Sequence, residues 1–282
     1  IVSYFDRYTN QRAVNGQFSG RAEFPLQRIR PAIAGSFQRA FDRPGNEIDD
    51  RVLHQTASGS ISLSTRVTSR SALIVTGSRE QTTFAGTAAS RGVNLSTALD
   101  RTSTGVTAAF RFDITPLTFL TVDTSGSRDQ FLVSRERQTD NFRINTGLEF
   151  APDAVVRGRA VVGYHAMVSR GTSGLPFRGW TSAVDLSYAL LGRTRFDIRF
   201  ARDAQYSIIG GGGISTSVAG GAEVLHNLIG PLDMTLRGSR ERVNYLAGVS
   251  RPIDSIDQTT TLGGGLSTRI SPQMRIAVIY EL

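Results

Sequence analysis

Arginine and aspartate recur at every second position in several stretches of this sequence. The pair Arg111 and Asp113 and the triplet Arg195, Asp197 and Arg199 show the spacing. Fixed guanidinium and carboxylate groups can select a charged solute, or they can pair with each other and support the fold. The residue types alone leave both interpretations open. The candidate residues are Arg111, Arg143, Arg157, Arg159, Arg195, Arg199, Arg237, Asp113, Asp123, Asp185 and Asp197.

Other polar residues give little support to catalysis. The histidines are His54, His165 and His226, and their spacing matches no metal motif. A hydrolase using His165 with an aspartate and a serine is conceivable, but no motif supports it. The glycines at 210–213 lack the following Lys-Ser/Thr of a phosphate loop, which favours a turn. We therefore expect neither enzyme activity nor a metal or cofactor.

Composition narrows the class of protein. The chain has 282 residues, no cysteine and a formal net charge of +8, and all 32 of its basic residues are arginine. The arginines are dispersed and often alternate with acidic residues, which disfavours nucleic-acid binding. No stretch approaches the roughly 18 continuous apolar residues of a membrane-spanning helix, and no long segment has helical periodicity. The sequence therefore predicts an all-β protein.

The stretch from Thr102 to Arg128 shows the structural unit. Val106, Ala108, Phe110, Phe112 and Ile114 alternate with more polar residues, as in a strand with two unlike faces. Thr115-Pro116 interrupts this pattern because proline has no N–H for the strand ladder, and a second alternating run follows. The stretch is therefore predicted to be a hairpin.

The same unit repeats along the whole chain. Predicted turns fall near residues 26, 68, 116, 152, 192, 230 and 271, so the period is about 40 residues. A propeller of that period would need a recurrent Trp-Asp signature, whereas this chain has one tryptophan, Trp180. The pattern predicts seven hairpins and fourteen strands, or fifteen if residues 1–12 form a first strand.

The two faces of these strands differ in polarity. One face is apolar and the other carries the charged candidates, and strands near ten residues match the roughly 9 to 11 needed to cross a bilayer at a tilt. A soluble sheet with its polar face in water is the alternative, but fourteen strands exceed the usual size of an open sheet. Because backbone groups in hydrocarbon must all be paired, a membrane sheet has to close. We expect a closed antiparallel up-and-down transmembrane β-barrel of about 14–16 strands.

Turns such as Thr115-Pro116, Ala151-Pro152-Asp153 and Ser271-Pro272-Gln273 lie between the amphipathic strands. With them the chain resembles Gram-negative outer-membrane β-barrel, porin-like proteins over its whole length. The resemblance implies a single barrel domain over residues 1–282 in the bacterial outer membrane, with short turns facing the periplasm. It also implies that lipid is a partner, and it allows a homo-oligomer or a periplasmic or secreted partner. Since Met274 to Leu282 would run outward, we expect a further returning strand and a sixteen-stranded barrel, with fourteen strands as the alternative.

In such a barrel the charged candidates would line the lumen. An excess of arginine there would favour anions, because charged rings in a pore select by sign. The leading hypothesis is a pore for hydrophilic solutes, anionic ones in particular, or for an exported polymer. The alternatives are a structural or docking barrel with a plugged or partner-occupied lumen, and a soluble or surface-exposed β adhesion domain.

Overall fold

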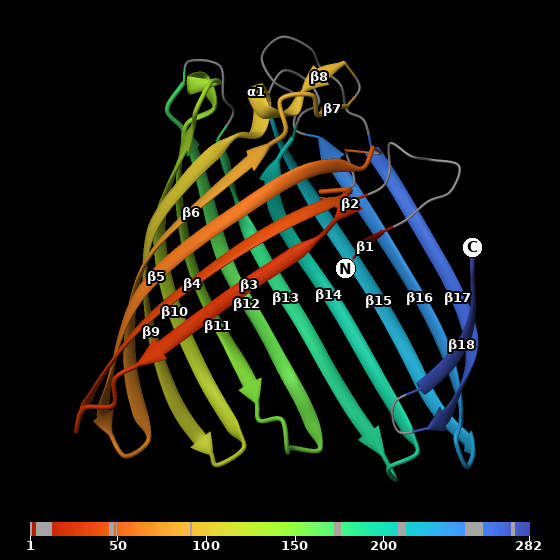
Figure 1. Ribbon diagram of the computed structural model, residues 1–282. Helices are drawn as coiled ribbons and strands as arrows, with labels where there is room; N and C mark the ends of the chain where they lie inside the picture. The colour runs from red at the N-terminus through yellow and green to blue at the C-terminus, as the bar shows by residue number, and fades with distance from the viewer. Residues whose placement is uncertain are drawn as a thin grey trace.

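The chain forms one large antiparallel sheet. The computed structural model describes residues 2–3, 13–44, 48, 50–90, 92–171, 176–207, 213–245, 256–271 and 274–282. Among them, fourteen strands lie in the order β3-β4-β5-β6-β9-β10 and then β11 to β18 in sequence. Each strand pairs with the one that precedes it along the sheet, so the sheet is an up-and-down meander that wraps into a barrel (Figure 1).

The alternating segments of the sequence become the strands of this sheet. In the first half the strands are β3 (Gly16–Glu23), β4 (Ile29–Asp42), β5 (Val52–Thr68), β6 (Ser71–Phe84), β9 (Arg101–Thr115) and β10 (Thr118–Phe131). In the second half they are β11 (Thr139–Phe150), β12 (Val156–Ser169), β13 (Phe177–Leu190), β14 (Thr194–Tyr206), β15 (Ile214–Ile229), β16 (Leu232–Tyr245), β17 (Ile256–Ser271) and β18 (Met274–Glu281).

Short connections join the hairpins at one end of the barrel, the lower end in Figure 1. The strand ends fall at all seven positions predicted from the sequence, from residues 23–29 to residues 271–274. Between β13 and β14 the turn is tight, because the Arg193 N–H donates to the Leu190 carbonyl at 3.1 Å. Leu191 (φ 51°) and Gly192 (φ 68°) are both left-handed, as a two-residue type I′ hairpin turn requires.

Longer connections lie at the opposite end. Between β6 and β9 the chain forms β7 (Ala89–Ser90), β8 (Val93–Asn94) and the short helix α1 (Leu95–Leu99), which the sequence did not predict. The Asn94 side chain caps α1 by accepting the Thr97 N–H at 3.1 Å, and Leu95 is fully buried in a small apolar cluster with Ile48 and Val52. Among the residues described, no helix is both long and apolar enough to cross a membrane.

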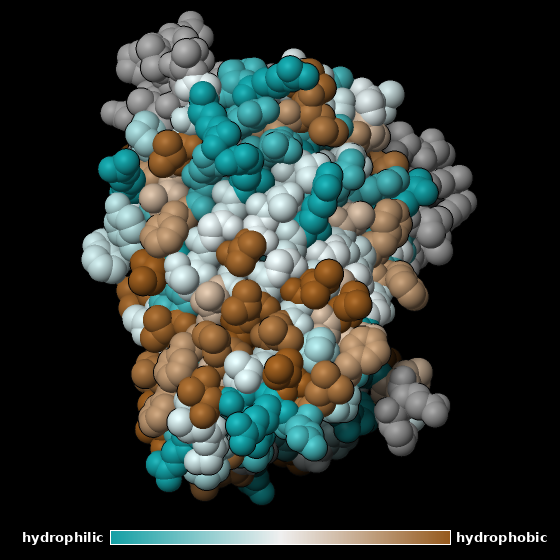
Figure 2. Space-filling view, turned by 90° about the vertical axis from the view of Figure 1, so that its left-hand side faces the viewer, coloured by the Kyte–Doolittle hydropathy of each residue, from teal (hydrophilic) through white to brown (hydrophobic). Residues whose placement is uncertain are grey.

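The outer face of the barrel is apolar toward the short-turn end. Figure 2 shows apolar side chains gathered over the lower half of one side and hydrophilic ones above them. On β9, Val106, Phe110, Phe112 and Ile114 are exposed despite being large and apolar, which suits contact with lipid. The opposite, concave face of the sheet is its lumenal face (Figure 1).

An all-β, antiparallel up-and-down barrel of about 14–16 strands is thus confirmed, with two differences. The edges of the sheet are β3 and β18, and no hydrogen bond joins them among the described residues, so the predicted closure is not made there. The strand predicted for residues 1–12 does not extend the sheet, because β1 (Val2–Ser3) pairs with β2 (Ala13–Val14) in a separate two-stranded sheet. Residues 4–12 lie outside the described residues.

Candidate functional site

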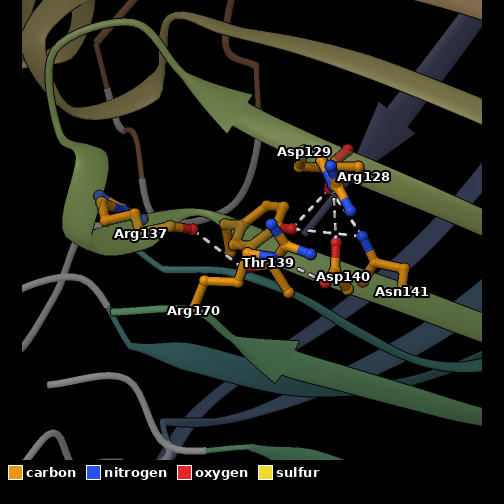
Figure 3. A network of polar contacts seen from close by, with 8 residues as sticks. Arg128, Asp129, Arg137, Thr139, Asp140, Asn141 and Arg170 are labelled. Atoms are coloured by element: carbon orange, nitrogen blue, oxygen red, sulfur yellow. Dashed lines mark hydrogen bonds and ion pairs between the residues drawn. The ribbon is translucent and has the colours of Figure 1, made fainter. Parts of the chain in front are cut away.

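A group of polar side chains meets across the lumen near the long-loop end. The Tyr206 hydroxyl on β14 donates to Asp129 Oδ2 on β10 at 2.5 Å, and Asn141 Nδ2 on β11 donates to the same oxygen at 2.9 Å. Figure 3 shows Asp129 and Asn141 side by side. Three strands separate β10 from β14 in the sheet, so these contacts exist only because the sheet is strongly curved.

Aromatic and cationic side chains surround this contact. The Arg101 guanidinium lies 5.5 Å from the centre of the Tyr206 ring, and the Phe131 ring meets Tyr206 edge-on at 5.1 Å. Arg137, which belongs to the short 3₁₀ turn η2 (Arg135–Arg137), donates from Nη2 to the Ser207 carbonyl at 2.8 Å. These contacts tie the connection after β10 to the end of β14.

A second cross-lumen group lies next to the first. Arg143 Nη1 on β11 donates to Asp203 Oδ2 on β14 at 2.9 Å, and His165 Nδ1 on β12 lies 3.2 Å from Asp203 Oδ1. Because an ionised carboxylate only accepts, Nδ1 carries the proton of this hydrogen bond. His165 is 1% exposed, and its Nε2 has no hydrogen-bond partner among the described residues.

These groups line a lumenal cavity of about 680 Å³, within the usual range for small-molecule sites. The cavity is lined by the arginines Arg43, Arg101 and Arg143 and by the carboxylates of Asp42, Glu80 and Asp129. Its charges are therefore balanced. Three buried atoms of its lining residues, His54 Nδ1, Asn141 Oδ1 and His165 Nε2, have no hydrogen-bond partner among the described residues, and His54 Nδ1 lies 3.5 Å from Asp42 Oδ1. Buried polar atoms normally have a partner.

The rim of this cavity connects to the helix α1. Leu99 and Phe84 line the cavity, and the carboxylate of Asp100 accepts the Phe84 N–H at 2.7 Å. Burial raises the pKa of Asp100 above its usual range, although the hydrogen bond from Phe84 acts in the opposite direction.

A second lumenal cavity, of about 690 Å³, lies along β12 to β18. It brings together five of the residues singled out in the sequence: Arg159, Asp185, Asp197, Arg199 and Arg237. Glu223, Glu241 and Glu281 add further carboxylates to its wall. In neither cavity does arginine exceed the carboxylates by number, so the expected excess of lumenal arginine is not found in the part of the lumen that these cavities describe.

Most of the predicted lumenal residues are paired. Ion pairs join Arg111 to Asp113 (3.3 Å), Arg195 to Asp197 (2.8 Å), Arg199 to Asp185 (4.0 Å) and Arg237 to Glu281. Asp123 accepts Asn145 Nδ2 at 2.8 Å, and Arg157 donates to the Ala154 carbonyl at 3.3 Å. Arg159 has no ion pair with a described residue.

Sequence reasoning named Arg143 and noticed His165, but it missed Asp129, Asp203 and Tyr206. Asp203 and Tyr206 lie at the upper end of β14. Their side-chain partners lie on other strands, far away in the sequence: Arg143 on β11, His165 on β12 and Asp129 on β10. Acidic and aromatic residues cluster at the ends of these strands, which indicates a polar site there. Which residues they contact follows only from the curvature of the sheet. No group of three or more metal-binding side chains occurs within the described ranges.

Comparison with known proteins identifies the fold. Two solved structures of mutants of the ferric enterobactin receptor PfeA from Pseudomonas aeruginosa match the chain with TM-scores of 0.51 and 0.53, each at 11% sequence identity. The matches cover 94% and 93% of this chain and 50% of each receptor chain, so the chain spans half the length of those receptors. No protein-family model and no curated protein sequence matches it.

The fold is therefore that of Gram-negative outer-membrane β-barrels, and the predicted resemblance to that class is confirmed at the level of the fold. At this sequence identity the likeness extends to the architecture alone.

Proposed function

We propose that this protein is a non-enzymatic β-barrel of the bacterial outer membrane that carries hydrophilic solutes through its lumen. The cavity of about 680 Å³ near the long-loop end supports the proposal most directly. It lies on the side from which a solute outside the cell would arrive if the short turns face the periplasm. We further propose that Arg101, which is partly exposed in the wall of this cavity, contacts the solute first.

The chemistry of the cavity favours a solute with several polar groups. Balanced arginines and carboxylates offer both hydrogen-bond donors and acceptors. The anion preference expected from the sequence stays a prediction. That preference would depend on arginines that have no carboxylate partner among the described residues. Such arginines are Arg43 and Arg101 in the first cavity and Arg159 in the second.

The matched structures carry the name of ferric enterobactin receptors, which adds an iron chelate to the solutes worth testing. A docking or plugged barrel is the second candidate, and the numerous cross-lumen contacts of Asp129 and Asp203 favour it, because they narrow the long-loop end.

Conductance in planar bilayers tests the transport proposal. We expect a stable conductance, with ion selectivity read from the reversal potential in a salt gradient, and partial block by a solute that enters the cavity. A panel of neutral sugars, organic phosphates and ferric enterobactin shows which class of solute enters the cavity and blocks the conductance.

Arg101→Gln should weaken the block and shift the selectivity toward cations. Arg79→Gln is the matched control, because this substitution removes the same charge from the outer face of β6 and not from the lumen. A protein that inserts but never conducts would support the docking barrel. A protein that dissolves without detergent would support the adhesion domain and refute the membrane assignment.

A further inference from the structure

Charges are distributed unequally between the two faces of the barrel. Because side chains alternate along a regular strand, the pairing register assigns residues to the lumenal or the outer face, except at the upper end of β14, where Asp203 and Tyr206 both contact lumenal residues. On the described strands, Asp140 is the single acidic residue on the outer face, and it already binds Arg128 Nε at 3.0 Å and Arg170 Nε at 2.6 Å (Figure 3). Outer-face arginines without any ion pair to a described residue are Arg39, Arg79, Arg178, Arg202, Arg240 and Arg242.

These arginines lie within one band around the barrel. They are eight to twelve residues from the short-turn ends of their strands, as Arg240 is from Leu232 and Arg178 is from Leu190. A strand rises about 3.4 Å per residue, so at a tilt near 45° an apolar band of about 25 Å takes roughly ten residues. The arginines therefore begin where the apolar band of the outer face ends, at the level of lipid headgroups.

Three of them form a cluster on β14 to β16. Arg202 and Arg242 both pair in register with Val218, one from each side, and Arg240 lies two residues below Arg242. Two strand spacings separate Arg202 from Arg242, or about 10 Å. In the register Val218 and Gly220 lie between the three arginines, and the Phe200 ring leans over Gly220, because a Cβ atom there would lie 3.7 Å from Phe200 Cδ2.

An apolar hollow lies directly below this cluster on the same face. It has a volume of about 510 Å³ and is lined by Ala222, Val224, Leu236, Gly238, Leu262 and Tyr280, among others. Gly238 is two residues below Arg240 and helps to form the hollow, because a Cβ atom there would lie 3.2 Å from Leu262 Cδ2. Leu236 and Leu262 are more than half exposed.

We propose that the outer face of β14 to β17 binds a phosphate-bearing anionic lipid of the surrounding bilayer. Arg202, Arg240 and Arg242 hold the phosphate groups, and the hollow below them receives an acyl chain. Guanidinium groups suit phosphate because they donate paired hydrogen bonds to its oxygens. An acidic protein partner would match the arginines but would leave the apolar hollow without an occupant, whereas one lipid molecule matches both. The inference rests on the membrane location proposed above.

The single tryptophan of the chain provides the probe. Trp180 lies on the outer face of β13 and is 65% exposed, and Ser182, two residues below it, pairs in register with Arg202. Protein in vesicles of phosphatidylcholine is titrated with phosphatidylglycerol that carries bromine near the headgroup, and brominated phosphatidylcholine is the reference. Bromine quenches tryptophan on contact, so the quenching reports which lipid occupies the adjacent site.

We expect the anionic lipid to compete for this site about tenfold better than phosphatidylcholine in low salt, and much less so in high salt, because charge contacts are screened. The triple variant Arg202→Gln, Arg240→Gln, Arg242→Gln should lose the preference. The corresponding triple Lys variant should keep most of it, and the matched control Arg159→Gln, Arg195→Gln, Arg199→Gln should keep all of it, because these residues face the lumen. Circular dichroism confirms that each variant is folded.

Equal quenching by both lipids, or an unchanged preference in the triple Gln variant, would overturn the lipid site while leaving the barrel proposal intact. Absence of quenching by either lipid would instead show that Trp180 does not face a bilayer, which would refute the membrane location itself.

Discussion

The hydroxyl of Tyr206 on β14 donates a 2.5 Å hydrogen bond to Asp129 on β10, although three strands lie between the two residues in the sheet. This contact spans the lumen at the long-loop end of the barrel. Asn141 shares the same carboxylate oxygen, so one aspartate links three strands.

Replacing this hydroxyl tests how much the contact stabilises the barrel. Tyr206→Phe leaves the buried Asp129 carboxylate with one donor fewer, and we expect the free energy of unfolding to fall by about 1–3 kcal/mol. Urea unfolding in detergent micelles, followed by Trp180 fluorescence, measures it. Tyr188→Phe, on the outer face, is the control, and an equal loss there would contradict the special role of Tyr206.

The ion pair between Arg143 and Asp203 is expected to influence selectivity. Asp203→Asn leaves the Arg143 charge uncompensated in the wall of the cavity, so the reversal potential should shift toward anions. Asp153→Asn makes the same change in net charge in the short turn between β11 and β12, away from the cavity. If both variants shift the potential alike, overall charge and not the lumenal pair sets selectivity.

The apolar cluster around α1 should unfold locally when its centre is removed. Leu95 is fully buried, so Leu95→Ala is expected to cost about 2–5 kcal/mol through lost contacts and a cavity. Hydrogen exchange of residues 92–100 measures the local opening. Leu191→Ala, at an 89% exposed site in a short turn, should leave that exchange unchanged. Unaltered protection in Leu95→Ala would mean that the cluster does not hold this segment.

Acidification should stabilise the connection between α1 and β9 through Asp100. Because burial raises the pKa of Asp100 in the folded protein, the folded state binds the proton more tightly than the unfolded one. This stabilising contribution is complete when the pH is below the ordinary pKa of aspartate, near 3.8. It is lost as the pH rises through the raised pKa of Asp100 in the folded protein. Hydrogen exchange of the Phe84 amide, followed as a function of pH, measures this contribution.

Asp100→Asn supplies the control for that titration. The amide oxygen can still accept the Phe84 N–H, but it cannot ionise. Protection of the Phe84 amide should therefore become independent of pH in the acid range. A variant that keeps the pH dependence of the parent would assign the titration to another group.

Local patterns in the sequence determined the strands and their two faces. A strand has a side-chain period of two, so Phe110, Phe112 and Arg111 reveal their faces without any knowledge of their neighbours. Proline and glycine mark turns through their own backbone restrictions, which is why the seven short connections could be located. The membrane-type architecture followed from strand length and number.

The tertiary structure decided which polar groups meet. Asp129, Asp203 and Tyr206 contact partners on strands several places away, and such contacts depend on the curvature of the whole sheet, to which no local pattern is sensitive. The same holds for charge: the sequence shows an excess of arginine, but only the register of the strands shows that acidic residues face the lumen almost throughout while unpaired arginines gather on the outer face. A one-residue shift in register would reverse that assignment, and pairing across the sheet is what prevents it.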